Sequence, residues 1–288
     1  MSGAILVTGA TGNVGSEIVR LLPREQVRIA SRTVTEGQKR YPDGYDIREF
    51  NFERPETLAP ALVGVEKIFL MRPPALANVP RYFAPAIEAM RAAGVQQVVF
   101  LSLVGADRNR VVPHHKIEKL LEASSMAWTF LRASFFMQNL STTHRDEIRD
   151  DHELALPSGN GRTSFIDVRD IAAVGAKALL EPGHERKAYT LTGPEALTYG
   201  EVTALMTEIL GVPIRYRQIN PLAFVRLQMR RGNPLAYALV TTVLYTTARF
   251  GLAGSLTDEL QAVLGRAPRT VRQFIQDYRA VWLQPESR

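Results

Sequence analysis

Short apolar runs alternate with longer amphipathic segments along the first two-thirds of the chain, and this alternation limits the fold more than any other feature. The apolar runs are rich in β-branched residues and have the length of strands, whereas the segments between them have helical spacing. Strands are expected at Ala4–Val7, Val27–Ala30, Ile47–Phe52, Lys67–Met71, Gln97–Ser102, Trp128–Arg132 and Ala188–Leu191, with helices over 14–22, 80–93 and 116–123. This order predicts an α/β fold with a doubly wound parallel sheet of the Rossmann type.

A glycine-rich turn follows the first expected strand directly. Residues 8–15 read Thr-Gly-Ala-Thr-Gly-Asn-Val-Gly and lead into the first helix. Glycines let the backbone approach a pyrophosphate closely, and the helix N-terminus presents free N–H groups to it. We therefore expect a dinucleotide site here, held by Gly9, Thr11, Gly12, Asn13 and Val14.

The end of the second expected strand bears on the choice of cofactor. An NAD site usually carries an acidic residue about 20 residues beyond the glycine turn, whereas an arginine there suits the 2′-phosphate of NADP. Residues 29–34 contain no acid, and Ser31 and Arg32 occupy the strand end. The sequence thus favours NADP(H), with Ser31 and Arg32 in the site; the alternative is that Arg32 is an ordinary solvated residue.

The alternation weakens after residue 140, and this change divides the chain. We expect an NADP-binding Rossmann domain over 1–139 and 163–193 and a smaller, mainly helical substrate lobe over 140–162 and 194–288. Within the lobe, residues 150–162 are expected as a loop or hairpin, and helices over 199–210 after a Thr198 cap, 221–231, 234–248 and 269–282. Asp170 is expected to cap a helix that begins at Ile171.

Composition narrows the setting and the partners. The chain has no cysteine, which excludes disulfides and thiolate metal sites, and its histidines show no metal-ligand spacing, so no metal is expected. Its first residues resemble a core strand and not a secretory signal, so we expect a cytoplasmic protein. Lys and Arg exceed Asp and Glu by 35 to 29 but are scattered, which argues against nucleic acid as a partner. The uncharged stretch 232–248 is shorter than the roughly 20 apolar residues that span a bilayer. We therefore expect it to form a buried helix and expect no membrane association.

Four segments resemble one known family. They are Thr8–Gly15, His115–Leu121, Trp128–Asn139 and Ser164–Ala172, and the third is the most specific. On these segments the chain resembles the atypical short-chain dehydrogenase/reductases, in particular the NmrA-like group with its NADPH-dependent quinone, azo and triphenylmethane dye reductases. The likeness covers nearly the whole chain.

The resemblance implies further site residues. Asn51 and Phe52 would border the adenine; Met71, Arg72 and Pro73 would line the inner ribose and nicotinamide side; Ser134 and Phe135 would flank the nicotinamide; and Phe136 and Asn139 would face the substrate. An aromatic and thioether cluster such as Phe135–Met137 suits a planar substrate, although it is also typical of ordinary core.

The chain departs from the family where the proton donor usually stands. Classical members use a Tyr-x-x-x-Lys pair, and alignment places Arg110 and His114 at those two positions. His114 is therefore the candidate catalytic residue, because an imidazole titrates near neutrality; the alternative is a helix-start residue without chemistry. Ser102 lies near the usual serine position but alone is a poor acid.

Two functions follow from these residues. The first is hydride transfer from NADPH to an electron-poor small molecule such as a quinone, an azo compound or another conjugated acceptor, which can take its proton from water afterwards. The second is a redox sensor that binds NADP(H) without turnover and changes its affinity for a protein partner, which the missing Tyr-x-x-x-Lys pair favours. The apolar helices after Pro221 also suggest a homodimer face.

Overall fold

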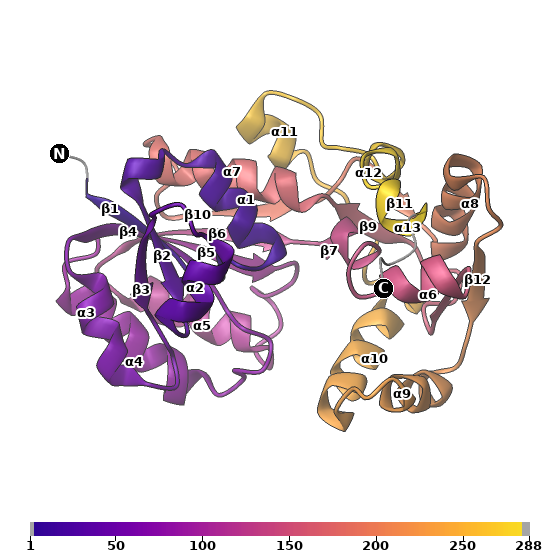
Figure 1. The fold of residues 1–288 in the computed structure, drawn as a ribbon, viewed down its shortest axis with the longest axis horizontal. Helices are drawn as coiled ribbons and strands as arrows, with labels where there is room; N and C mark the ends of the chain where they lie inside the picture. Colours follow the sequence, from indigo (N-terminus) through magenta and orange to yellow (C-terminus); the bar gives the residue numbers. More distant parts are fainter. Residues whose placement is uncertain (1–2, 284–288) are drawn as a thin grey trace. The chain divides into compact units, whose positions relative to one another are not determined.

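The computed structural model describes residues 3–283 and contains a seven-stranded sheet that is parallel throughout (Figure 1). Its strand order is β10-β6-β5-β4-β1-β2-β3. The strands are β1 (Ala4–Val7), β2 (Val27–Ser31), β3 (Asp46–Glu49), β4 (Val65–Met71), β5 (Gln97–Leu103), β6 (Ala127–Ala133) and β10 (Lys187–Leu191). The predicted Rossmann-type sheet is confirmed, and all seven predicted strands are present.

Helices cover both faces of this sheet because its strands are apolar on both sides. On one face α1 (Asn13–Leu21) packs against α7 (Val168–Leu180), and α7 also contacts α11 (Glu259–Leu264). On the other face α3 (Leu58–Leu62), α4 (Val79–Ala92) and α5 (Pro113–Ala123) lie in a row, while α2 (Val34–Arg40) packs on β2 and β3 (Figure 1). Phe83, Phe100 and Phe130 are among the fully buried side chains beneath this row.

The chain reverses its direction of travel across the sheet between β1 and β4. From β1 it runs outward through β2 to β3, then crosses back to β4 and continues through β5 and β6 to β10. The loops after β1 and β4 therefore separate at the carboxyl ends of these strands. Open α/β sheets bind their ligands at such a point.

A second compact unit is formed by residues 134–167 and 192–258 and by the described residues from 266 onward. It holds a three-stranded sheet, β11 (Ala196–Leu197), β9 (Thr163–Ile166) and β7 (Phe135–Phe136), and a parallel pair, β8 (Glu153–Leu156) and β12 (Arg215–Gln218). Its helices are α6 (Arg145–Asp150), α8 (Tyr199–Leu210), α9 (Pro221–Arg230), α10 (Leu235–Arg249), α12 (Val271–Asp277) and α13 (Ala280–Leu283).

The boundaries between the units differ from those expected from the sequence. Residues 134–139 and 163–167 belong to the second unit, because β7 pairs with β9 there. Residues 259–265 belong to the first unit, in which Thr190 N donates to Glu259 Oε2 at 3.0 Å. Strand pairing and one side-chain contact between distant segments thus decide the division.

Three local expectations were wrong. Residues 150–162 form no hairpin, since β8 pairs with β12 and β9 with β11 and β7. Asp170 does not cap a helix, because α7 already begins at Val168 and places Asp170, fully buried, in its first turn. The third strand ends at Glu49, since Asn51 turns away and its N donates to Thr57 Oγ1 at 3.0 Å. The Thr198 cap is confirmed as part of a capping box with Glu201.

The uncharged stretch 232–248 forms α10, but the expectation that this helix is buried was wrong. One stripe, made of Ala238, Thr242, Tyr245 and Ala248, is buried. Val240 and Val243 on other sides are 69% and 67% exposed. No helix within residues 3–283 has both the length and the apolar character needed to cross a membrane.

Candidate functional site

The glycine-rich turn after β1 is shaped so that two of its glycines are irreplaceable. Gly9 has φ +63°, and a Cβ there would lie 2.2 Å from Met71 Cε. A Cβ on Gly15 would lie 2.1 Å from the carbonyl oxygen of Gly9, so α1 could not pack this close to the turn. The turn therefore brings bare backbone to the carboxyl edge of the sheet.

The start of α1 fits a pyrophosphate. Gly12 is the N-cap and makes no side-chain cap bond, and the first turn contains no acidic residue. The first N–H groups of the helix thus lack the side-chain acceptor that usually satisfies them, and the positive end of the helix dipole faces no competing carboxylate. Thr8 fixes the turn, since its Oγ1 donates to Phe69 O at 3.0 Å and accepts from Met71 N at 2.7 Å. These residues could hold the phosphates of a dinucleotide.

The residues expected around the adenosine half differ in exposure. Ser31 is buried at the end of β2. The Arg32 side chain is 75% exposed, and its Nη2 lies 3.3 Å from Glu36 Oε1 in an ion pair one helical turn away. Phe52 is buried against the rings of Phe50 and Phe83, with centroids 5.2 and 4.7 Å apart. Arg32 is therefore a largely solvent-exposed charge, and the Phe52 ring is part of the core.

Arg72 and His114 lie on the other side of the switch point. Arg72 follows β4, and His114 is the second residue of α5. The ring of His114 stacks on Phe100 with centroids 6.0 Å apart. Burial, together with the charge of Arg72, lowers the pKa of His114 to about 3. His114 is therefore a neutral imidazole at any ordinary pH, and it cannot act as an imidazolium acid.

Arg110, at the position of the missing tyrosine, is exposed in the loop before α5. Ser102, the other residue considered from the sequence, is buried at the end of β5 and donates to Glu118 Oε1 at 2.6 Å. Its hydroxyl is engaged within the fold. Neither residue takes the place of a tyrosine proton donor.

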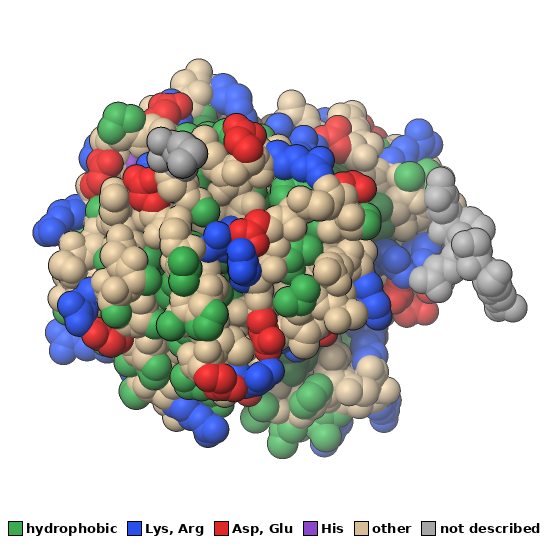
Figure 2. Space-filling view, turned by 60° about the vertical axis from the view of Figure 1, so that its left-hand side comes forward, with side chains coloured by type: hydrophobic (Ala, Val, Ile, Leu, Met, Phe, Trp, Pro, Cys, Tyr) green, Lys and Arg blue, Asp and Glu red, His purple; other side chains and the backbone are tan. Residues whose placement is uncertain are grey.

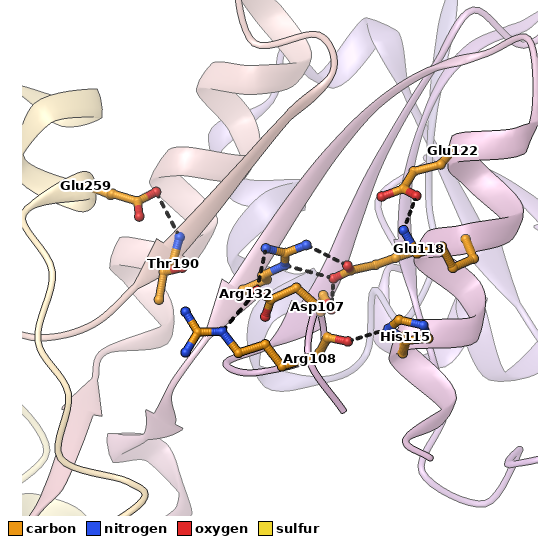
Figure 3. Close-up of polar contacts among 11 residues, drawn as sticks. Asp107, Arg108, His115, Glu118, Glu122, Arg132, Thr190 and Glu259 are labelled. Carbon is orange, nitrogen blue, oxygen red and sulfur yellow. Dashed lines mark hydrogen bonds and ion pairs between the residues drawn. The ribbon is translucent and has the colours of Figure 1, made fainter. Parts of the chain in front are cut away.

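The sequence did not reveal a buried ion pair that fixes α5 on the sheet (Figure 3). Glu118 accepts from Arg132 Nε at 3.1 Å and Nη2 at 2.7 Å, and the two side chains are only 2% and 17% exposed. His115 Nδ1 adds a bond to Ala106 O at 2.7 Å. An acid beside Ile117 on the apolar face of a helix, and an arginine inside an apolar strand, were the signals that could have identified this pair.

The residues expected at the nicotinamide and the substrate belong to the second unit. Ser134 is its first residue, and its Oγ is buried without a hydrogen-bond partner within the described chain. Phe135 packs on Tyr245, with ring centroids 6.2 Å apart. Phe136 completes β7, and Asn139 O accepts from His144 N at 2.9 Å. Phe135 and Phe136 are both partly exposed.

Comparisons with known proteins agree on the family. The model of the NmrA-like family matches residues 1–275. An NAD(P)H azoreductase from Xenophilus azovorans is 34% identical over an alignment that covers 96% of this chain and 99% of the azoreductase.

Solved structures agree on the fold. An NADPH-dependent quinone oxidoreductase from Escherichia coli, complexed with NADPH, is 25% identical with a TM-score of 0.85 over 95% of this chain and 99% of that one. A triphenylmethane reductase from Citrobacter sp., complexed with NADP(H), is 22% identical with a TM-score of 0.83 over 97% of this chain and 100% of that one. The chain belongs to the NmrA-like family.

Proposed function

We propose that this chain is an NADPH-dependent reductase that transfers hydride to a conjugated, electron-poor small molecule such as a quinone or an azo compound. The observation that carries the proposal is the glycine turn, where Gly9, Gly12 and Gly15 leave the start of α1 open to a pyrophosphate. Similarity to an azoreductase at 34% identity and to a quinone oxidoreductase at 25% identity supports the reaction class.

The chain would hold the cofactor in two halves. Gly9, Thr11, Gly12, Asn13 and Val14 surround the pyrophosphate, Ser31 and Arg32 take the 2′-phosphate, and Phe52 lies near the adenine. Met71, Arg72 and Pro73, with Ser134 and Phe135, border the nicotinamide side, and Phe136 and Asn139 face the substrate. Bound NADPH supplies hydride, and the protein supplies alignment and exclusion of water.

A conjugated acceptor suits a site without the tyrosine. Hydride adds two electrons and a proton to one end of the conjugated system, and the electron pair left on its distant oxygen or nitrogen takes a proton from water. The reaction therefore needs no side-chain acid, which agrees with a His114 that stays neutral. The sensor alternative needs the absence of turnover, and the named relatives at 34% and 25% identity give it no support.

The test mixes purified protein with NADPH or NADH and with one quinone and one azo compound, and follows the absorbance of the reduced nicotinamide. We expect acceptor-dependent oxidation of NADPH in preference to NADH. The matched control is Gly9→Val, which should abolish NADPH binding because a β-branched residue is strained at φ +63° and the turn would change shape. Tight NADPH binding without oxidation by any acceptor would establish the sensor instead.

We also propose that the protein acts in the cytoplasm, as a homodimer. Because it has no cysteine, the chain needs no oxidising compartment for disulfide formation, which is consistent with the cytoplasm. The exposed apolar side chains of α9 and α10 support an interface between two copies. On the face shown in Figure 2, Lys and Arg side chains are scattered, many of them beside acidic ones, and form no continuous basic surface for nucleic acid.

A further inference from the structure

We infer that Arg72 and His114 form an oxyanion site, which binds the oxygen or nitrogen that becomes negative when the acceptor is reduced. This inference rests on the proposed reductase function and names the side chains that replace the missing tyrosine. The substrate class that it implies is a conjugated acceptor whose reduced form is an anion, such as a phenolate or an anilide.

The guanidinium of Arg72 is fixed but incompletely paired. Its Nη1 donates to Pro73 O and Pro74 O, both at 2.9 Å, and to Leu76 O at 3.3 Å. Its Nε is buried and has no hydrogen-bond partner within residues 3–283. A buried donor without an acceptor destabilises the fold, more so when it is charged, and a ligand that supplied the acceptor would recover this free energy.

No carboxylate neutralises Arg72. None of the ion pairs found among the described residues includes it, and burial alone lowers its pKa, which for an arginine still leaves the group charged. It therefore differs from Arg132, whose charge is met by Glu118. The sheet edge beside β4 thus presents a partly buried cation that can pair with the negative charge of a ligand.

His114 supplies a second unpaired nitrogen in the same place. Its Nδ1 is buried without a partner in the described chain, and its ring stacks on Phe100 at an interplanar angle of 29°. Phe100, on which His114 stacks, pairs with Leu70 across β4 and β5, and Arg72 follows Leu70 by two residues, so both groups lie at the same edge of the sheet. In the tautomer with hydrogen on Nδ1, the neutral imidazole would donate a second hydrogen bond to the same acceptor. Two unpaired donors at one edge of the sheet would serve a developing negative charge as an oxyanion hole does.

The electron count of the step is complete. The C–H bond of the donor breaks, and a new C–H, N–H or O–H bond forms on the acceptor with the same electron pair. The displaced π electrons settle on the distant heteroatom, where Arg72 and His114 stabilise them until water delivers a proton. No further oxidant or reductant is needed.

The first test measures binding of a stable anion without turnover. 4-Nitrophenol is titrated into the protein, alone and with NADP⁺, at a pH below its solution pKa. We expect the wild-type protein to bind it as the coloured phenolate, and Arg72→Gln to lose this spectral change. Arg81→Gln, an exposed arginine at the start of α4, is the control and should behave as wild type. A wild-type protein that binds no phenolate, or an Arg72→Gln protein that binds it equally, overturns the inference.

The second test separates the acceptor from the cofactor. Arg72→Gln should lower kcat/KM by about a hundredfold, the usual loss for one oxyanion donor, while the NADPH dissociation constant changes less than about threefold. The loss of kcat/KM in Arg72→Gln should be larger with acceptors whose reduced anions are more basic. A loss of NADPH affinity that accounts for the lost activity would show instead that Arg72 holds the cofactor, and would overturn the inference.

Further variants at Arg72 and His114 distinguish loss of the oxyanion contacts from disruption of the loop after β4, whose carbonyl oxygens Arg72 binds. Arg72→Lys keeps the charge but not the fork of donors, and should retain more activity than Arg72→Gln. His114→Phe keeps the stacking on Phe100 and should lose about tenfold in kcat/KM, whereas His114→Asn, with an N–H near the Nδ1 position, should restore part of it. If the wild type reduces no acceptor, the reductase proposal fails while the phenolate titration still tests the site. If turnover survives Arg72→Gln unchanged, the reductase stands and the oxyanion site fails.

Discussion

Arg32 is the single residue on which the choice between NADPH and NADH depends. Its guanidinium is largely exposed and, within residues 3–283, forms an ion pair with Glu36 at 3.3 Å, so it can reorient toward a 2′-phosphate. Charge-assisted bonds to that phosphate are worth about 1.5–3 kcal/mol. Arg32→Ala should therefore weaken NADPH binding roughly ten- to hundredfold and leave NADH binding within about threefold, as measured by fluorescence titration.

Glu36 offers the matched control for Arg32. Glu36→Gln removes the carboxylate that competes with the phosphate, so it should strengthen NADPH binding and leave NADH binding unchanged. High salt should weaken NADPH binding in the wild type more than in Arg32→Ala, because salt screens exposed charges. Equal loss of both cofactors in Arg32→Ala would mean that Arg32 does not contact the 2′-phosphate.

The buried His114 predicts an acid-side dependence of stability. Its pKa falls from 6.5 to about 3 on folding, so between these values the unfolded chain binds a proton that the folded chain does not. The contribution of His114 to the free energy of unfolding is therefore fully present above about pH 6.5. Below that pH the free energy of unfolding decreases, by up to about 1.4 kcal/mol per pH unit. Denaturant unfolding at pH 6 and pH 4, which both lie between the two pKa values, should show a smaller decrease in the free energy of unfolding for His114→Gln than for wild type.

His152→Asn, at an exposed site with φ +52°, is the control for this series. Asparagine tolerates the left-handed backbone, so this variant should follow the wild-type curve. Identical pH slopes for His114→Gln and wild type would show that His114 is not protected from protons in the folded chain.

At the level of elements, α5 depends on one buried ion pair. Removing one partner of such a pair leaves an uncompensated charge and costs about 3 kcal/mol or more. Glu118→Ala would leave Arg132 with the long 3.9 Å pair to Asp107 in place of two short bonds, and would free the Ser102 hydroxyl. We expect a clearly lower thermal midpoint and, because α5 carries His114, a lower kcat/KM.

Glu122→Ala provides the comparison on the same helix. Glu122 pairs with Lys119 at 2.6 Å near the surface, with side chains 29% and 59% exposed. Exposed pairs contribute roughly 0.2–1 kcal/mol, so the thermal midpoint should change little. If Glu118→Ala and Glu122→Ala proved equally mild, the Glu118–Arg132 pair would not anchor the helix.

The elements also show how far sequence patterns reach. Every strand of the seven-stranded sheet and the glycine turn could be predicted, because apolar runs of strand length and closely spaced glycines are local signals. The exposure of α10 could not be predicted, since the sequence of an uncharged helix does not show which of its sides lacks a packing partner. The pairing of β8 with β12 could not be predicted either, because it joins residues about sixty positions apart.

One part of the candidate site could likewise be predicted from the sequence, and another could not. The glycine turn that would hold the phosphates is contiguous in sequence, and its motif identifies it. Arg72 and His114 are 42 positions apart and become neighbours only because β4 and β5 lie side by side. Their unpaired nitrogens depend on burial, which no spacing rule supplies. The sequence therefore identified both residues without the feature that gives them a shared role.

At the level of the whole molecule, the exposed apolar surface is concentrated in one stretch. Of the 17 large hydrophobic side chains that are exposed among the described residues, 11 lie between Leu222 and Leu256, on or beside α9 and α10. Monomeric proteins rarely leave such a surface bare, which is why we propose that two copies meet there. Val240 and Val243 are 69% and 67% exposed and are the most exposed of the large hydrophobic side chains on α10.

A charge placed on that surface should separate the copies. Val240→Asp combined with Val243→Asp would bury four carboxylates in a symmetric interface, two from each copy, with a penalty of several kcal/mol that none of the apolar neighbours offsets. Sedimentation velocity should therefore show a dimer for the wild type and a monomer for the double variant. The control is Val111→Asp, which changes a valine 83% exposed in the first unit and should leave the dimer intact. NADPH binding should persist in all three proteins, because the glycine turn lies in the first unit. A wild-type protein that sediments as a monomer at every concentration, or a double variant that still dimerises, would place the interface elsewhere or remove the need for one.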